Sequence, residues 1–154
     1  MIYFVGAGPG AEDLITVRGQ ALLKTADMVI YAGSLVNPAL LNCCPAGCEI
    51  LDSARMTLPE VIKAMARRDG LDATVVRLHT GDPSLYGAMR EQMDALRALG
   101  IGFQVVPGVS SVSAAAAAIP AEYTLPGVSQ TVILTRMAGR TPVPEAERIR
   151  ALAA

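Results

Sequence analysis

Short apolar runs alternate along the chain with longer segments in which apolar residues recur every three or four positions. The runs predict strands over residues 2–5, 28–31, 49–51, 74–78 and 103–106. The segments between them predict helices over residues 13–25, 57–70, 85–99 and 110–119, with a loop or short helix over 35–41. Because the strand runs are continuously apolar rather than alternating, they predict an α/β fold, a parallel sheet with helices on both faces.

The pattern changes after the fourth helix. Residues 120–130 form a linker containing proline and glycine, residues 131–135 predict a sixth strand, and residues 145–154 predict the start of a helix. The sixth strand either joins the first sheet or opens a second α/β domain, and the pattern alone leaves both open. The predicted organisation is a domain over residues 1–119, a linker over 120–130 and a further β–α unit over 131–154.

Composition narrows the class of protein. The chain has 154 residues, 52% of them apolar and 18% charged, and its mean hydropathy is +0.40, which indicates a folded domain with a sizeable core. A net charge of −1 argues against a nucleic-acid binder or a polybasic membrane-surface module. The apolar run at the N-terminus ends after five residues, and the longest apolar stretch, residues 105–119, is shorter than the ~20 residues of a membrane span. A soluble cytoplasmic protein is the expectation.

Cysteine and histidine offer little for metal chemistry. Cys43, Cys44 and Cys48 lie within six residues, but no C-x-x-C motif is present and the only histidine, His79, is far along the chain. An odd cysteine count favours a reducing compartment. Thiols packed in a loop are the simpler interpretation, and no metal is expected.

The first strand ends in a glycine-rich turn, G-A-G-P-G-A at residues 6–11. It satisfies the G-x-G-x-x-G/A pattern of dinucleotide sites. However, Asp27 precedes the second strand, whereas the carboxylate that binds a ribose hydroxyl should follow it. A turn that only lets two backbone segments pass closely is the alternative.

A second motif, H-T-G-D-P-S-L-Y-G at residues 79–87, follows the fourth strand. Gly81 permits close backbone approach, and Asp82 before a proline favours extended backbone that exposes its side chain. The structural alternative is that Asp82 caps the next helix, and both can hold together. His79 is more typical of a hydrogen-bonded residue at a strand end than of a catalyst.

A third turn, P-G-V-S-S at residues 107–111, follows the fifth strand. In a parallel sheet the three turns face one edge, where ligands collect. The chain contains no P-loop lysine, no G-x-S-x-G elbow and no H-E-x-x-H motif, which argues against a hydrolase. A reaction driven by an activated cofactor needs the protein mainly to align the reactants, so a chain with few acid–base side chains at these turns can catalyse it.

Taken together, these motifs resemble those of the tetrapyrrole methylases of corrin and sirohaem synthesis. The similarity rests on V-G-A-G-P-G, D-L-I-T with Gly19, G-D-P-S-L-Y-G and P-G-V-S-S. Three further segments are most similar to the enzymes of this family that methylate C-11 of a precorrin macrocycle, with or without cobalt. They are V-I-Y-A-G-S-L-V at residues 29–36, T-V-I-L-T-R at 131–136 and T-P-V-P-E at 141–145.

The resemblance implies two α/β domains and an S-adenosylmethionine (SAM) cofactor. By position, SAM contacts are expected from Pro9, Thr80, Gly81, Asp82, Leu85, Ser110, Ser111 and Met137. Tetrapyrrole contacts are expected from Gly8, Gly10, Tyr86 and Arg136, with Arg55, Arg136 and Arg140 as candidates to pair with substrate carboxylates. No side chain is required to act as a nucleophile or as another catalytic group.

Family members are longer than this chain, so the resemblance implies a truncated second domain. It also implies a homodimer for the complete enzyme, and weak SAM binding without turnover for the 154-residue form. Two alternatives remain at this point. One is an NAD(P)-dependent reductase that uses the first glycine turn, and the other is a non-catalytic α/β ligand-binding domain.

Overall fold

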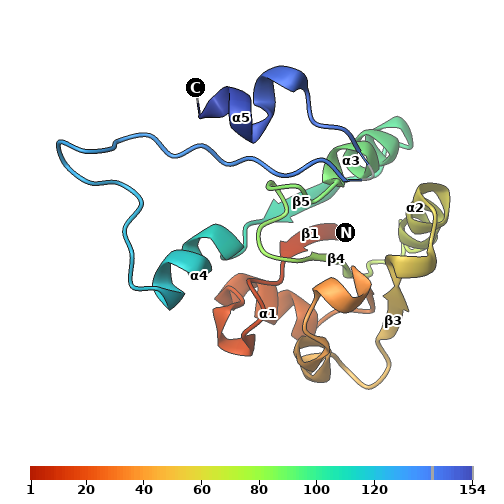
Figure 1. Ribbon diagram of the computed structural model, residues 1–154. Helices are drawn as coiled ribbons and strands as arrows, with labels where there is room; N and C mark the ends of the chain where they lie inside the picture. The colour runs from red at the N-terminus through yellow and green to blue at the C-terminus, as the bar shows by residue number, and fades with distance from the viewer. Residues whose placement is uncertain (140, 154) are drawn as a thin grey trace. The chain divides into compact units, whose positions relative to one another are not determined.

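The computed structural model describes residues 1–139 and 141–153 (Figure 1). The chain divides into two compact units, Met1–Ala117 and Ala118–Ala154. Among the described residues no helix is both long enough and apolar enough to cross a membrane.

The first unit is built on one five-stranded sheet. Its strands are β1 (Ile2–Gly6), β2 (Met28–Tyr31), β3 (Glu49–Asp52), β4 (Val75–His79) and β5 (Phe103–Val106), in the order β3-β2-β4-β1-β5. Every pairing is parallel. The predicted parallel sheet is confirmed, and the bounds of each strand lie within one residue of those predicted.

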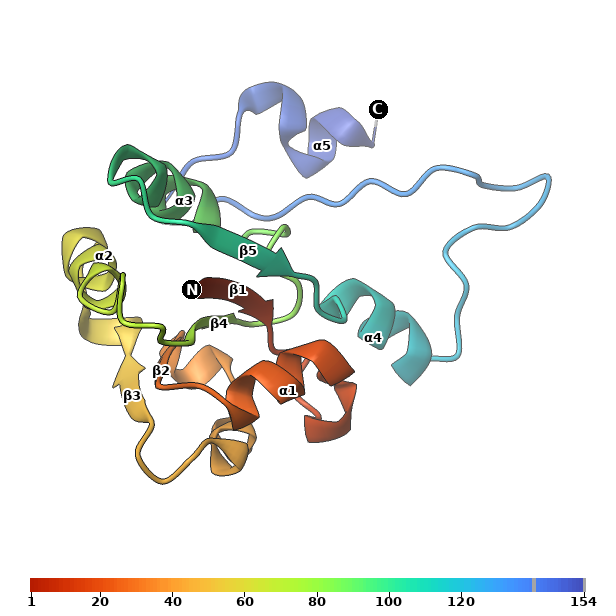
Figure 2. The same cartoon turned by 180° about the vertical axis from the view of Figure 1, so that it is seen from behind.

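Two apolar clusters lie on opposite faces of this sheet. Val5 of β1 packs with Leu23 of α1 (Val17–Lys24) on one face. Phe4 packs on the other face with Met65 of α2 (Leu58–Ala66) and Leu96 of α3 (Met89–Ala98). Figure 2 shows α2 and α3 on one side of the strands and α1 on the other. Neighbouring residues of a strand point to opposite faces, so a continuously apolar strand is buried on both.

All four predicted helices begin later than the apolar pattern suggested, α2 by one residue, at Leu58. The helix expected from residue 13 is a 3-10 turn, η1 (Glu12–Leu14), followed by α1, because Thr16 Oγ1 accepts a hydrogen bond from the Gly19 N–H at 3.1 Å and caps the helix there. The helix expected from residue 85 begins at Met89, because a turn over residues 83–86 and two further non-helical residues, Gly87 and Ala88, come before it. The fourth helix, α4 (Ser111–Ala118), begins one residue late.

The predicted capping box at the start of α2 is confirmed. Glu60 Oε2 accepts hydrogen bonds from the Thr57 backbone N–H and hydroxyl, both at 2.7 Å, and these lower the pKa of Glu60. The segment predicted as a loop or short helix over residues 35–41 forms two 3-10 turns, η2 (Gly33–Leu35) and η3 (Pro38–Cys43). A further 3-10 turn, η4 (Ser53–Arg55), follows β3.

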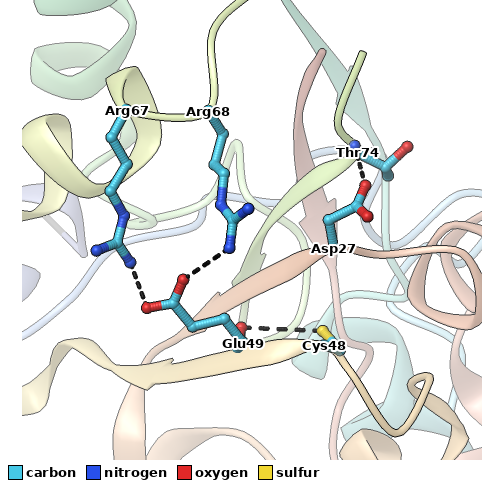
Figure 3. Close-up of polar contacts among 6 residues, drawn as sticks. All are labelled: Asp27, Cys48, Glu49, Arg67, Arg68 and Thr74. Carbon is cyan, nitrogen blue, oxygen red and sulfur yellow. Dashed lines mark hydrogen bonds and ion pairs between the residues drawn. The ribbon is translucent and has the colours of Figure 1, made fainter. Parts of the chain in front are cut away.

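Polar contacts join the elements at the edge of the sheet where β2, β3 and β4 begin (Figure 3). The Glu49 carboxylate accepts hydrogen bonds from Arg67 and from Arg68, the latter at 3.1 Å. Asp27 accepts a hydrogen bond from the Thr74 N–H at 2.7 Å. These contacts anchor the end of α2 to β3 and the start of β4 to β2, far from the carboxyl ends of the strands.

The second unit has little regular structure in its described residues. Residues 131–135, predicted as a strand, do not form a strand. A strand needs a neighbouring strand as its hydrogen-bond partner, and the described part of this unit contains no such partner for these residues. The helix expected from residue 145 is a 3-10 turn, η5 (Glu145–Glu147), and one helical turn, α5 (Ile149–Leu152).

Candidate functional site

The three glycine-bearing turns lie together at one edge of the sheet. They follow β4, β1 and β5, which are neighbours in the strand order. The Gly8 N–H donates to the Gly81 carbonyl at 3.2 Å, and the Gly81 N–H donates to the Gly8 carbonyl at 2.9 Å. The predicted convergence of these turns is therefore confirmed.

Backbone from the three turns passes so closely that no side chain fits at two of the glycines. A Cβ on Gly6 would lie 2.5 Å from Gly108 Cα and 2.6 Å from the Gly81 carbonyl oxygen, and a Cβ on Gly108 would overlap that same oxygen. Gly81 differs, because the nearest atom to its Cβ position would be 3.7 Å away while its φ is +57°. Gly81 is thus needed for its left-handed backbone conformation, since a Cβ there would make only an ordinary van der Waals contact with Ser111 N.

Asp82 ties two of these turns together. One carboxylate oxygen accepts from the Ser84 N–H at 2.8 Å and from the Ser84 hydroxyl, and the other accepts from the Gly108 N–H at 2.9 Å. Partial burial raises the pKa of the Asp82 carboxyl, but the hydrogen bonds from Ser84 and Gly108 outweigh it and the net pKa is lowered. The structural alternative, that Asp82 caps the next helix, is wrong, because α3 begins at Met89, after Ala88.

The turn between Asp82 and α3 places two large apolar side chains at the surface. Leu85 is 37% exposed and Tyr86 is 61% exposed. Tyr86 and Ala88 have φ values of 57° and 48°, a left-handed conformation that is rare outside glycine. A strained turn with exposed apolar side chains beside a glycine-lined edge is typical of a ligand site.

Seven of the eight residues expected to contact SAM lie in the three turns or beside them. Thr80 and Ser111 are exposed, Pro9 is half-buried, and the Ser110 hydroxyl accepts from the Val112 N–H at 3.2 Å. Gly8, Gly10 and Tyr86, expected to contact the tetrapyrrole, belong to the same turns. Arg55 is exposed at the end of η4, after β3.

Met137 and Arg136 belong to the second unit. Both line a cavity of about 310 Å³ formed with residues of that unit. The Arg136 guanidinium donates to the Thr141 hydroxyl at 2.9 Å and to the Pro142 carbonyl at 3.3 Å. Arg140 lies outside the described residues.

His79 does not have the properties of an acid–base catalyst. It is 3% exposed at the end of β4, and its Nε2 has no hydrogen-bond partner among residues 1–139 and 141–153. Burial lowers the pKa of His79 to about 3, with a smaller contribution from the charge of Arg77. A hydrogen bond with the Gly87 backbone raises the pKa but is outweighed. The imidazole is therefore neutral at pH 7.

The three cysteines lie around the end of η3, with half-buried thiols that form no disulfide. Burial, and then the neighbouring thiols of Cys48 and Cys43, raise the pKa of Cys44 to about 12. Within residues 1–139 and 141–153, no three His, Cys, Asp or Glu side chains are placed to hold a metal ion.

Sequence interpretation missed one charged residue near this edge, Arg77 in β4. Its Nε donates to Gln92 Oε1 at 3.0 Å, and its Nη1 donates to the Ile30 carbonyl at 3.1 Å. The available signal was an arginine inside a strand that is otherwise apolar. A charged residue at such a position must be buried with polar partners or next to a cavity.

Comparison with known proteins places these features in a family. The family described as Tetrapyrrole (Corrin/Porphyrin) Methylases matches residues 1–154. A cobalt-precorrin-4 C(11)-methyltransferase of Methanocaldococcus jannaschii is 53% identical over 152 residues, which are 99% of this chain and 59% of that relative. A precorrin-4 C(11)-methyltransferase of Mycobacterium tuberculosis is 52% identical over 153 residues, 99% of this chain and 61% of that relative. The chain thus spans about three fifths of the length of these curated relatives.

Solved structures show the same likeness. The X-ray structure of a cobalamin biosynthetic enzyme, cobalt precorrin-4 methyltransferase, has a TM-score of 0.94 at 53% identity and covers 99% of this chain and 64% of that one. A uroporphyrin-III C-methyltransferase of Thermus thermophilus, solved with S-adenyl homocysteine, has a TM-score of 0.69 at 32% identity and covers 84% of this chain and 52% of that one. From its family match, its relatives and its fold, the chain belongs to the tetrapyrrole (corrin/porphyrin) methylases.

Proposed function

We propose that this chain is part of a SAM-dependent methyltransferase that methylates C-11 of precorrin-4 or cobalt-precorrin-4 in cobalamin biosynthesis. The observation that carries the proposal is the junction of the three glycine turns at one edge of the sheet, in a chain about half identical to enzymes of that name. A cytoplasmic location and a homodimeric complete enzyme are predicted from composition and family resemblance alone.

The residues at the site fit SAM in two respects. The exposed Thr80 and Ser111 offer hydroxyl groups for hydrogen bonds. The exposed Leu85 offers an apolar surface to the flat adenine or to the aliphatic part of the cofactor. The T. thermophilus relative, which was solved with S-adenyl homocysteine, supports the same ligand class.

In this proposal Pro9, Gly81, Leu85 and Ser110 hold the cofactor, and the other predicted contacts surround them. SAM, when bound, would supply an electrophilic methyl group on its sulfonium, and S-adenosylhomocysteine would leave as that methyl carbon bonds to the electron-rich C-11. The chain contributes orientation and exclusion of water, which can lower a barrier by up to ~7–11 kcal/mol when the reacting groups are aligned. His79 is neutral and buried, and the proposal assigns it no proton transfer.

The other two functions considered lack support. No carboxylate ends β2, where a nicotinamide cofactor would need one for its ribose, and the curated relatives carry methyltransferase names. Those names also speak against a non-catalytic binding domain.

The first prediction tests cofactor binding. Residues 1–154 are joined to the part of the M. jannaschii relative that this chain does not match, and S-adenosylhomocysteine is titrated into the joined protein by calorimetry. Binding is expected, and Leu85→Glu is expected to weaken it at least tenfold, because a carboxylate replaces an apolar contact. Leu71→Glu, at an exposed leucine in the turn before β4, is the matched control and should change affinity less than twofold.

A joined protein that folds but gives no heat with S-adenosylhomocysteine, while the native relative does, would overturn the proposal. Tight binding of NADP⁺ in its place would restore the reductase alternative.

A further inference from the structure

A small cavity lies on the α2 and α3 side of the sheet, next to the middle of β4. Its volume is about 180 Å³. Its lining residues come from η4, from the first turns of α2 and α3 and the residues just before them, and from β4. They are Ser53, Met56, Leu58, Val61, Arg77, Ala88, Glu91 and Gln92. The N-terminal ends of two helices therefore face this space, each with a partial positive charge.

Arg77 gives the cavity a buried positive charge. The residue is only 7% exposed, and its Nη2 has no hydrogen bond among the described residues. Burial lowers the pKa of Arg77 to about 10, so the guanidinium remains protonated at pH 7. Glu91 lines the same cavity but is exposed and forms no ion pair with Arg77 in the described part of the chain.

A buried cation without a counter-charge is unfavourable, so the site favours an anion from outside the chain. The remaining walls limit its chemistry. Met56, Leu58 and Val61 are apolar, and the Ser53 hydroxyl already donates to the Tyr31 carbonyl at 2.8 Å. A carboxylate on a short alkyl chain matches one guanidinium edge and an apolar wall.

The cavity is close to the site of methyl transfer proposed above. Arg77 is three residues before Thr80 along β4, roughly 10 Å in an extended strand. Ala88, which lines the cavity, lies just after the turn that carries Leu85 and Tyr86. A large ligand at the glycine turns could therefore extend an arm to Arg77.

We propose that the Arg77 cavity binds one peripheral carboxylate arm of the tetrapyrrole and so fixes the orientation of the macrocycle. This inference rests on the proposed function, since the macrocycle must be the source of the arm. A free short-chain acid has the same chemistry, and the experiment separates the two sources.

The second prediction uses propionate as the probe and its neutral isostere propionamide as the control. The Nε–H resonance of Arg77 is followed by ¹⁵N NMR in the 154-residue chain and is identified by its loss in Arg77→Lys. Propionate is expected to shift this resonance in a saturable way, and propionamide is expected to leave it unchanged. No shift with propionate would overturn the site.

A matched pair at the cavity wall tests the location without changing the core. Leu58 is 40% exposed and begins α2, where an acidic residue is favourable. Leu58→Glu puts a carboxylate into the cavity and should weaken propionate binding at least tenfold, while Leu58→Gln should change it less than twofold. Equal effects of the two variants would contradict the proposal.

Competition then identifies the source of the arm. Uroporphyrinogen III, kept reduced under anaerobic conditions, is expected to displace propionate, and Arg77→Met should lower its affinity about tenfold or more. Arg97→Met, at the far end of α3, is the control for the lost charge and should have less than a twofold effect. Propionate binding that uroporphyrinogen III does not displace would overturn the assignment to the macrocycle. These results do not depend on S-adenosylhomocysteine, so either proposal can fail alone.

Discussion

Single residues fix the shape of the candidate site. Gly6 and Gly108 leave room for three backbone segments to cross, and Asp82 joins the turn after β4 to the turn after β5. The side chains that would meet a ligand, Leu85 and Thr80, stand on this rigid base. The exposed residues can therefore change with the ligand, whereas the two glycines cannot change without moving the backbone.

The third prediction concerns Gly108. Gly108→Ala should lower the free energy of unfolding by about 3 kcal/mol, because the added methyl group overlaps a backbone carbonyl that cannot rotate away. Denaturant unfolding of the 154-residue chain measures the change. Gly47→Ala is the control, since no atom lies within 4 Å of its Cβ position, and a loss equal to that of Gly108→Ala would contradict the steric explanation.

Elements of the first unit are held at the opposite edge by charged contacts. Glu49 at the start of β3 accepts from Arg67 and Arg68, which follow α2 (Figure 3). Partial burial of Glu49 raises the pKa of its carboxyl, but hydrogen bonds from Arg68 and Arg67 outweigh it and the net pKa is lowered. The contact therefore stabilises the fold above the ordinary pKa of 4.5 and is lost as pH falls through the lower folded value.

The fourth prediction follows from that sign. Glu49→Gln should cost about 0.5–1 kcal/mol of unfolding free energy at pH 7, a small value because the pair is partly exposed to solvent. The cost should shrink below pH 4 and in 1 M salt, as measured by thermal unfolding. A cost that is the same at pH 3 and pH 7 would show that the charge of Glu49 does not stabilise the fold.

Over the whole molecule, regular structure is concentrated in the first unit. Of the described residues between 119 and 144, none belongs to a helix or a named strand, and most are exposed. Residues 1–117, in contrast, contain the sheet and both apolar clusters. The two units should therefore differ in their resistance to unfolding.

The fifth prediction uses limited proteolysis. Subtilisin should cut first between residues 119 and 144, because a protease needs an exposed, irregular backbone, and a fragment of about the first unit should persist. Mass spectrometry locates the cuts. First cleavage within residues 83–88 would show instead that the candidate site is the least stable part of the chain.

The sequence predicted the parts of this protein that depend on local pattern. Five strands and the convergence of three turns followed from apolar runs and glycine positions. The late starts of α1 and α3 did not, because a threonine cap at Thr16 and left-handed backbone at Tyr86 and Ala88 override the apolar pattern. Arg77 was missed because its partners, Gln92 and Ile30, are set by the tertiary fold.

The strand order has a consequence for how the chain acquires its structure. β1 is first in the chain, yet it pairs with β4 and β5, with Ile2 beside Val75 and Phe103. During synthesis from the N-terminus, this strand stays without a partner until more than half of the first unit has been made. Chains dominated by such distant pairings fold slowly. The apolar β1 therefore stays unpaired in the nascent chain, where it is the segment most prone to aggregation.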